Sequence, residues 1–381
     1  MKLNLIFNNS FFKVVFVIYL LLKPFLFFDN GSPQISDCVL IPTLLLYFGI
    51  FRPTDLLKEK PVQFLVAFLT IVFVVNVGYA TLPFETYQWE FLVPFFYYGY
   101  NALLFIFCSC LFKTFTKKDF TVFLFVIFIS LGIQFLLILL DIDKGVVNNF
   151  KGRDYNYFNN PNQLAYYSLL LLTFLFFVRK QVLQLPYLVT LCVSLALVSI
   201  VCATSFPALL GGLFLLVLYI LILLKKDFYK HLLVLLIAPL LLVVIKHDTI
   251  AMEYNRIANR FDSPTQRVEN SYADRGYDRV FVYPHYLLYG AGEGMYERFV
   301  PKSEKRPQEI HNTIINFFFN YGVLGGIMFV LFLYHSFKLT MISQLVYLFP
   351  IIVYNLLHNG IRYSLIWVII AYIHYASQAH K

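Results

Sequence analysis

The pair His311-Asn312, followed by Asn316 and Asn320, is the first candidate for chemistry. These asparagines recur every four residues, so in a helix they form one polar stripe. Such a stripe within an apolar helix must face other helices or a wet cavity. Histidine is the commonest general base, although a single histidine at an interface is as often structural. The run His358-Asn359-Gly360-Ile361-Arg362 repeats the pairing and adds Arg362 as a candidate for the same cavity.

A second group lies upstream. Ser271 and Asp274 have the spacing of a capping box, which predicts a short helix after them. Arg275 and Arg279 would then share one helix face, and two guanidinium groups suit a diphosphate. The alternative is a solvated network in which both arginines pair with neighbouring acids. Beyond this helix, the run Gly290-Ala291-Gly292-Glu293-Gly294 predicts a flexible turn.

The third group is Asn159-Asn160-Pro161-Asn162-Gln163-Leu164-Ala165. Asn160 suits a helix cap and Pro161 the first helical position, so a helix is expected to begin here. The free amides and the positive end of the helix dipole would form an anion site, and Arg153 a little upstream would close over it. Asn160 and Asn162, like Asn312 and Asn316, are candidates for polar contacts in the acceptor cavity. The alternative is that the asparagines only cap the helix.

The composition shows which elements must hold these groups. The chain has 381 residues, of which 60% are hydrophobic and only 13% charged. About a quarter charged is usual for soluble domains, so most of this chain must face lipid or other apolar helices. The net charge of +9 lies in short clusters between apolar runs, which argues against nucleic-acid binding. The five cysteines all lie in apolar segments and are interpreted as small hydrophobic residues.

The expected fold is all-α, a single integral membrane domain over 1–381 with about twelve transmembrane helices. The first apolar run lacks a cleavage site and is interpreted as a span rather than a signal peptide. The spans are expected at about 11–28, 35–51, 61–83, 91–112, 120–140, 161–178, 183–203, 206–224, 232–246, 312–334, 345–357 and 364–376.

The loops differ between the two sides of the membrane. Every short loop on one side carries lysine or arginine, so the positive-inside rule places that side and both termini in the cytoplasm. On the outer side lie a smaller loop, 141–160, and a large loop, 247–311, between the ninth and tenth helices. Their basic residues are mostly arginine, whose planar fork suits phosphate. Long loops also escape the insertion rule, so a charged loop without function is the alternative.

Other chemistries lack their signatures. The chain has neither a glycine-rich nucleotide loop ending in Lys-Ser/Thr nor an HExxH zinc motif. No metal or cofactor is therefore expected. A lipid-linked oligosaccharide flippase is the main alternative function, but it should place charges within its spans, whereas here they gather in outer loops. A structural scaffold is a third possibility.

The ordered motifs resemble the O-antigen ligase and polymerase superfamily of bacterial envelope glycosyltransferases. The resemblance rests on three elements in the order of that family. They are the run Asn159 to Ala165 opening a span, the arginine segment leading to the Gly-x-Gly turn, and His311-Asn312 followed by Asn320-Tyr321-Gly322-Val323-Leu324-Gly325-Gly326. The similar region covers about residues 150–330.

This resemblance implies a metal-independent, inverting enzyme of the bacterial inner membrane. It would move a glycan from undecaprenyl diphosphate onto a sugar hydroxyl of a glycan or lipid A core acceptor at the periplasmic face. His311 would be the base, and Arg275 and Arg279 the diphosphate clamp, with Arg153 an accessory contact. A chain-length regulator is a candidate partner. Residue usage typical of AT-rich polysaccharide gene clusters favours a polymerase over a ligase.

The chain departs from that family at one motif. Many relatives carry Ser-Arg-Gly/Ala after the seventh helix, where this chain has Thr204-Ser205-Phe206-Pro207-Ala208. One phosphate contact of the family is therefore missing, and Arg362 is the residue hypothesised to replace it.

Overall fold

The computed structural model describes residues 9–28, 32–52, 54–83, 88–143, 154–223, 228–246, 275–299 and 309–378. Throughout these ranges the regular elements are helices and there is no strand. This agrees with the all-α fold expected from the sequence. Residues 144–153, with Arg153, and 247–274, which hold the expected capping box, lie outside the described residues.

Eight helical segments are long and apolar enough to cross a bilayer, judged by length and composition. They support a multi-pass membrane protein. They are α4 (Lys60–Ala80), η2 with α5 (Gln88–Phe91 and Val93–Phe112), α6 (Lys117–Leu139), α7 with η3 (Pro161–Val178 and Arg179–Val182), α8 (Pro186–Ala203), α9 (Phe206–Leu223), α10 (Phe228–Ile245) and α15 (Thr313–Phe337).

The other four expected spans are helical but shorter. They are α2 (Asn9–Leu22), α3 (Ile35–Phe51), the run α16, η5 and α17 (Ile342–Leu345, Val346–Leu348 and Phe349–Leu357), and α18 (Ser364–Gln378). Twelve spans therefore stay a prediction. Proline marks several boundaries: Pro161 and Pro186 open α7 and α8, where a missing N–H costs nothing.

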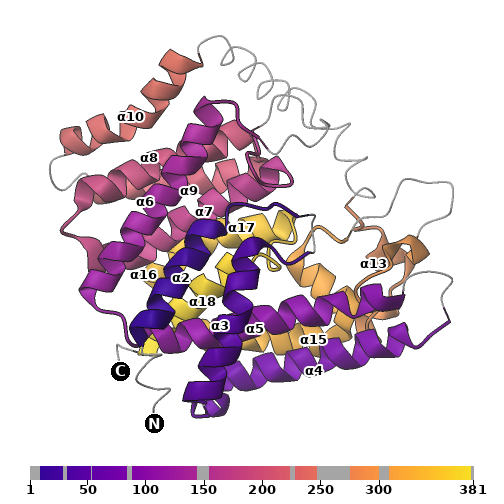
Figure 1. The fold of residues 1–381 in the computed structure, drawn as a ribbon. Helices are drawn as coiled ribbons and strands as arrows, with labels where there is room; N and C mark the ends of the chain where they lie inside the picture. The colour runs from indigo at the N-terminus through magenta and orange to yellow at the C-terminus, as the bar shows by residue number, and fades with distance from the viewer. Residues whose placement is uncertain are drawn as a thin grey trace. The chain divides into compact units, whose positions relative to one another are not determined.

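The chain divides into two compact units. The first comprises residues 1–50, 111–262 and 342–354. In it, α8 packs against α6, α7, α9 and α10, and α2 packs against α6 (Figure 1). Thr116 and Asp119 form a reciprocal capping box that fixes the start of α6. Aromatic side chains such as Phe16, Phe123 and Phe174 fill the core.

The second unit comprises residues 51–110, 263–341 and 355–381. Here α4 runs antiparallel along α15, since Phe64 stacks on His335 and Phe68 contacts Phe329. Tyr98 of α5 packs on the same aromatic core, and α18 packs on α15. This packing brings three segments between the longer helices together at one end of the unit: 290–299, 309–312 and 358–363.

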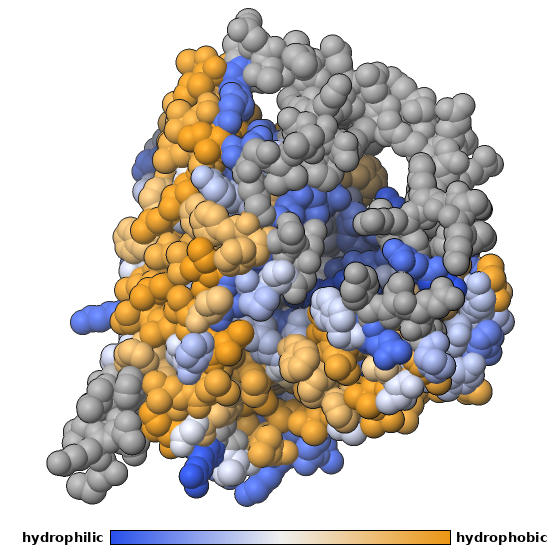
Figure 2. Space-filling model, turned by 45° about the vertical axis from the view of Figure 1, so that its right-hand side comes forward, coloured by the Kyte–Doolittle hydropathy of each residue, from blue (hydrophilic) through white to orange (hydrophobic). Residues whose placement is uncertain are grey.

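The surface of the described residues is strongly apolar. Large hydrophobic side chains stand exposed on most of the long helices, and orange hydrophobic atoms cover broad areas in Figure 2. Examples are Leu213 on α9, Leu233 on α10 and Phe96 on α5. Patches of this extent on a water-soluble monomer are rare, so the surface favours a lipid environment.

Candidate functional site

The candidate site is built on the start of α15. Asn312 caps this helix, because its side-chain oxygen accepts the N–H of Ile315 at 2.9 Å. The same side chain donates to the carbonyl of Leu356 at 2.9 Å. Thr313 donates its hydroxyl to Asn355 at 2.8 Å. The first turn of α15 is thereby tied to the end of α17.

Helix α15 is broken at Gly322, whose φ of 68° and ψ of −179° are not helical. Such a break removes intrahelical partners from carbonyls in the preceding turn, and inside a membrane these must be satisfied elsewhere. The N–H groups of Ala291 and Gly292 donate to the carbonyls of Phe319 and Asn320 at 2.9 and 2.8 Å. The glycine run 290–294 therefore completes the hydrogen bonding of the broken helix.

This tight docking corrects the expectation of a flexible turn. A Cβ on Gly290 would lie 2.6 Å from the carbonyl oxygen of Asn320, and one on Gly322 would lie 2.5 Å from that of Leu288. Both glycines also have positive φ. The glycines here allow two backbones to meet rather than allowing motion.

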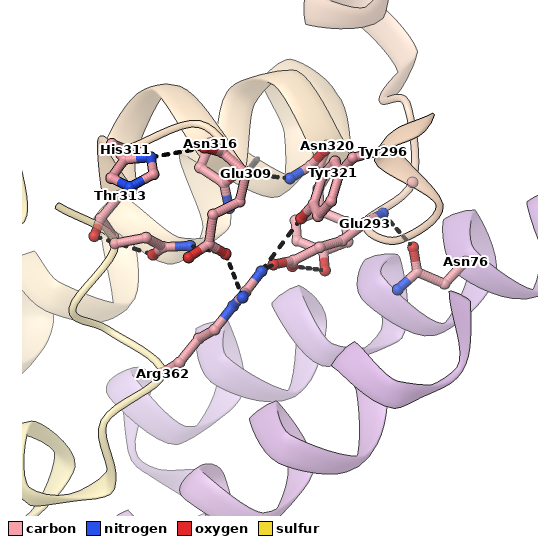
Figure 3. A network of polar contacts seen from close by, with 12 residues as sticks. Asn76, Glu293, Tyr296, Glu309, His311, Thr313, Asn316, Asn320, Tyr321 and Arg362 are labelled. Atoms are coloured by element: carbon pink, nitrogen blue, oxygen red, sulfur yellow. Dashed lines mark hydrogen bonds and ion pairs between the residues drawn. The ribbon is translucent and has the colours of Figure 1, made fainter. Parts of the chain in front are cut away.

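The turn carries Glu293 into a network of charges (Figure 3). The guanidinium of Arg362, in the loop between α17 and α18, pairs with the carboxylates of both Glu293 and Glu309. Tyr321 donates its hydroxyl to Glu293 at 2.5 Å, and the N–H of Glu293 donates to Asn76 of α4 at 2.9 Å. Only 1% of the Glu293 side chain is exposed. The network ties α4, α15 and the α17–α18 loop together.

Both Glu293 and Arg362 are ionised in this setting. Burial opposes the charge of Glu293, but Arg362 and the hydroxyl of Tyr321 hold the pKa of that carboxyl below its usual value. Burial likewise opposes the charge of Arg362, but Glu293 and then Glu309 hold its pKa well above its ordinary value. A buried carboxylate and its partner thus stabilise each other's charge.

His311 lies beside this network and is held from several sides. Its ring Nδ1 lies 2.9 Å from the carbonyl oxygen of Glu309. A carbonyl only accepts, so Nδ1 is the donor in this contact, and in the neutral tautomer compatible with it Nε2 holds the lone pair. The N–H of His311 donates to the carbonyl of Arg275, and Tyr277 donates its hydroxyl to the carbonyl of His311. The imidazole is therefore oriented with Nε2 as its basic atom.

The arginines are placed differently from the expectation. Gly276 has φ +70° and helix α13 (Arg279–Val282) begins only at Arg279, so Arg275 and Arg279 do not share a helix face. Arg275 instead donates to the carbonyl of Leu357, and within the described residues it forms no ion pair. Arg279 is buried against the rings of Tyr296 and Phe299, and burial lowers its pKa.

Arg298 is a further cation at this end. Its guanidinium lies over the rings of Tyr79, Phe91 and Phe299 and donates to the carbonyls of Ala291 and Gly292. Burial lowers the pKa of Arg298 to about 10. Arg298 therefore fastens the glycine turn while remaining a cation at neutral pH.

The predicted asparagine stripe is buried. Asn316 and Asn320 have no exposed surface, and Asn320 donates to the side-chain oxygen of Asn316 at 2.9 Å. Asn316 Nδ2 and Asn320 Oδ1 have no partner among the described residues. The stripe faces the interior of the unit, as its four-residue spacing predicts.

Asn160 and Asn162 belong to the first unit. Asn160 caps α7, accepting the N–H of Gln163 at 3.0 Å, which confirms the cap expected from the sequence. The carbonyl of Asn162 accepts the hydroxyl of Tyr354 at 2.9 Å. Both residues thus serve the local structure at the start of α7.

Sequence reasoning missed Glu293, Glu309, Tyr321 and Arg298 as site residues. The signal for Glu293 was present: it is an acid set between glycines in a turn otherwise free of charge. Its pairing with Arg362 could not be predicted, because 68 residues that include helices α15, α16 and α17 separate the partners.

Comparison of this chain with protein-family models, with curated proteins and with solved structures finds no match. Among the described residues no group of three or more His, Cys, Asp or Glu side chains is arranged to hold a metal ion. The polar groups described at this end of the unit are an oriented imidazole, a paired carboxylate network and several arginines.

Proposed function

We propose that this chain is a membrane glycosyltransferase that moves a glycan from undecaprenyl diphosphate onto a sugar hydroxyl. The observation that carries the proposal is the oriented His311, with a basic Nε2, at the end of the unit that also holds Arg275 and Arg279. The resemblance of the ordered motifs to O-antigen ligases and polymerases supports the same reading. By the charge of the loops, this site faces the periplasm and both termini lie in the cytoplasm of a bacterial cell.

In this reaction the acceptor oxygen attacks the anomeric carbon while the bond from that carbon to the diphosphate breaks. His311 Nε2 takes the hydroxyl proton, and the configuration at carbon inverts. The leaving diphosphate gains negative charge, which a nearby guanidinium stabilises without a metal. Arg275 is the first contact for this charge, since no carboxylate of the described residues neutralises it. Arg279 adds positive potential from its aromatic setting.

In this scheme Arg362 acts on His311 through Glu309, rather than on the diphosphate as hypothesised from the sequence. Two carboxylates already hold its guanidinium, so it acts by fixing Glu309, whose carbonyl orients His311. Asn359 also donates to the Glu309 carboxylate, at 3.3 Å.

A lipid-linked oligosaccharide flippase is the second candidate, and one observation favours it. Helix α15 is interrupted at Gly322 beside the buried Glu293, and interrupted helices with nearby charges are common at transporter substrate sites. The two functions differ in whether His311 is needed for bond formation, which can be measured directly.

The first experiment uses membranes containing the full chain and an undecaprenyl-diphosphate-linked glycan from the strain that carries the gene. His311→Ala should lower glycan transfer by about 10² to 10⁴, the usual range for loss of a general base. His285→Ala is the matched control, because this exposed histidine lies in the same loop, and it should transfer normally. Equal transfer by both variants at equal membrane levels would exclude His311 as the base.

The second experiment examines surface polysaccharide of a deletion strain on a gel. A core bearing one repeat unit identifies a polymerase, whereas bare core with long lipid-linked chains accumulating identifies a ligase. Repeat units trapped on the cytoplasmic face would instead identify a flippase and exclude the transferase.

A further inference from the structure

Two short helices in the second unit expose an apolar surface. Helices α13 (Arg279–Val282) and α14 (Tyr286–Tyr289) span residues 279–289. After the buried Arg279, residues 280–289 contain no Asp, Glu, Lys or Arg. The exposed fractions are 74% for Phe281, 61% for Val282, 71% for Leu288 and 55% for Tyr289. These four residues are called the α13–α14 apolar face below. Such side chains would ordinarily be expected to turn inward.

They cannot turn inward, because the other side of the same segment is already packed. Tyr283 and Tyr286 contact Phe299, and Tyr286 also contacts Phe319 of α15. Ala291 and Ile310 complete this buried cluster. One apolar side of the segment is therefore packed against the rest of the unit, whereas the other apolar side is exposed.

The exposed side continues the lipid-facing surface of the long helices. The backbone at Leu288 meets Gly322, and the next residues of α15, Val323 and Leu324, are exposed. Tyr79, at the end of α4, donates its hydroxyl to the carbonyl of Gly290 at 3.0 Å. The segment therefore lies level with the end of a 21-residue helix, about 30 Å long, where a bilayer interface is expected.

Aromatic residues at this level favour the same placement. Trp89 of η2 is exposed at this end of the unit, where the N–H of Met295 donates to Glu90 of the same short helix. Tyr289 belongs to the face itself. Tryptophan and tyrosine are enriched at membrane interfaces, where their rings are apolar and their polar atoms reach water.

We propose that the α13–α14 apolar face is an interfacial membrane anchor whose occupant is bilayer lipid. Its side chains lie among the upper acyl chains of the leaflet, and the segment holds the glycine turn and Glu293 at a fixed depth. The face carries no charge that would select a protein partner, and it is continuous with surface that faces lipid. This inference does not depend on the proposed glycosyl transfer.

The experiment places a single tryptophan at the face in the full chain. Both native tryptophans, Trp89 and Trp367, are replaced by Phe, and Leu288→Trp or Val282→Trp is added. Glu297→Trp in the same background is the matched control, since Glu297 is exposed on the same loop outside the face. Each protein is reconstituted into phosphatidylcholine–phosphatidylglycerol vesicles, with or without lipids brominated near the glycerol end of the acyl chains.

The expected result is that Leu288→Trp and Val282→Trp lose fluorescence to brominated lipid, emit at shorter wavelength and resist aqueous acrylamide. Glu297→Trp should show the reverse. If acrylamide quenched the fluorescence of Leu288→Trp and Val282→Trp as strongly as that of Glu297→Trp, the face would lie in water and the proposal would be overturned. Protection from both quenchers would mean that protein covers the face, from another segment or a second copy, and would overturn it equally.

Discussion

The starts of α7 and α15 use the same device in different surroundings. Asn160 and Asn312 each cap a helix by accepting the N–H three residues ahead, at 3.0 and 2.9 Å. Around Asn160 the contacts are neutral: Asn159 donates to Gln163, and Tyr354 stacks on Tyr166. Beside Asn312 lie His311 and a network of three charged side chains. The two caps thus have the same geometry, and only the second lies beside converging charges and an oriented imidazole. This difference is the basis of the proposal that the reactive site lies at the start of α15.

The largest expected difference between the two units concerns their ion pairs. Arg362→Gln leaves the buried carboxylate of Glu293 without its counter-charge, which should lower the free energy of unfolding by about 3–5 kcal/mol. Asp141→Asn removes the pair with Lys246 in the first unit, where Asp141 is exposed, and should cost at most about 1 kcal/mol. Unfolding in mixed detergent–SDS micelles measures both. Equal losses would mean that the buried network contributes no more than a surface pair.

The next largest difference between the two units is expected for substitution of a glycine in each. Gly322→Ala adds a Cβ at 2.5 Å from a backbone oxygen at positive φ, so it should destabilise by about 2–4 kcal/mol and loosen the turn. Gly132→Ala in α6 meets nothing within 4 Å and should be neutral or stabilising by up to about 1 kcal/mol. Unfolding of each variant is compared with the parent. A harmless Gly322→Ala would show that the two backbones do not meet as described.

The charge network also predicts a pH dependence. The pKa of Glu293 is lower in the folded chain than its usual value, so the unfolded state binds more protons between those two pKa values. The stability contributed by its ionisation is therefore present above about pH 4.5 and is lost as the pH falls below it. Glu293→Gln should reduce the fall in melting temperature between about pH 6 and pH 3, whereas the exposed Glu297→Gln should leave it unchanged. Identical pH profiles for parent and Glu293→Gln would remove this carboxylate from the acid response.

Much of the fold was predictable because hydrophobic runs and caps are local signals. The start of α7 at Pro161 and its cap by Asn160 follow from residue type alone. The helix expected to pair Arg275 with Arg279 was wrong, because Gly276 turns the chain between them. The network was not predictable, since Arg362 meets Glu293 only after α15, α17 and the glycine turn have packed. Local patterns therefore identify candidate residues, and tertiary packing decides which of them share a site.

The smallest effects test the two caps against each other. Asn160→Ala removes one capping bond and should cost about 1 kcal/mol. Asn312→Ala removes the cap and also the donation to the carbonyl of Leu356, so it should cost roughly another 1 kcal/mol. Because His311 is adjacent, Asn312→Ala should also reduce glycan transfer more than its stability loss explains, when both variants are compared at equal folded amounts. If Asn160→Ala reduced transfer as much, the start of α7 would belong to the reactive site as fully as the start of α15, and the contrast between the two helix starts would be wrong.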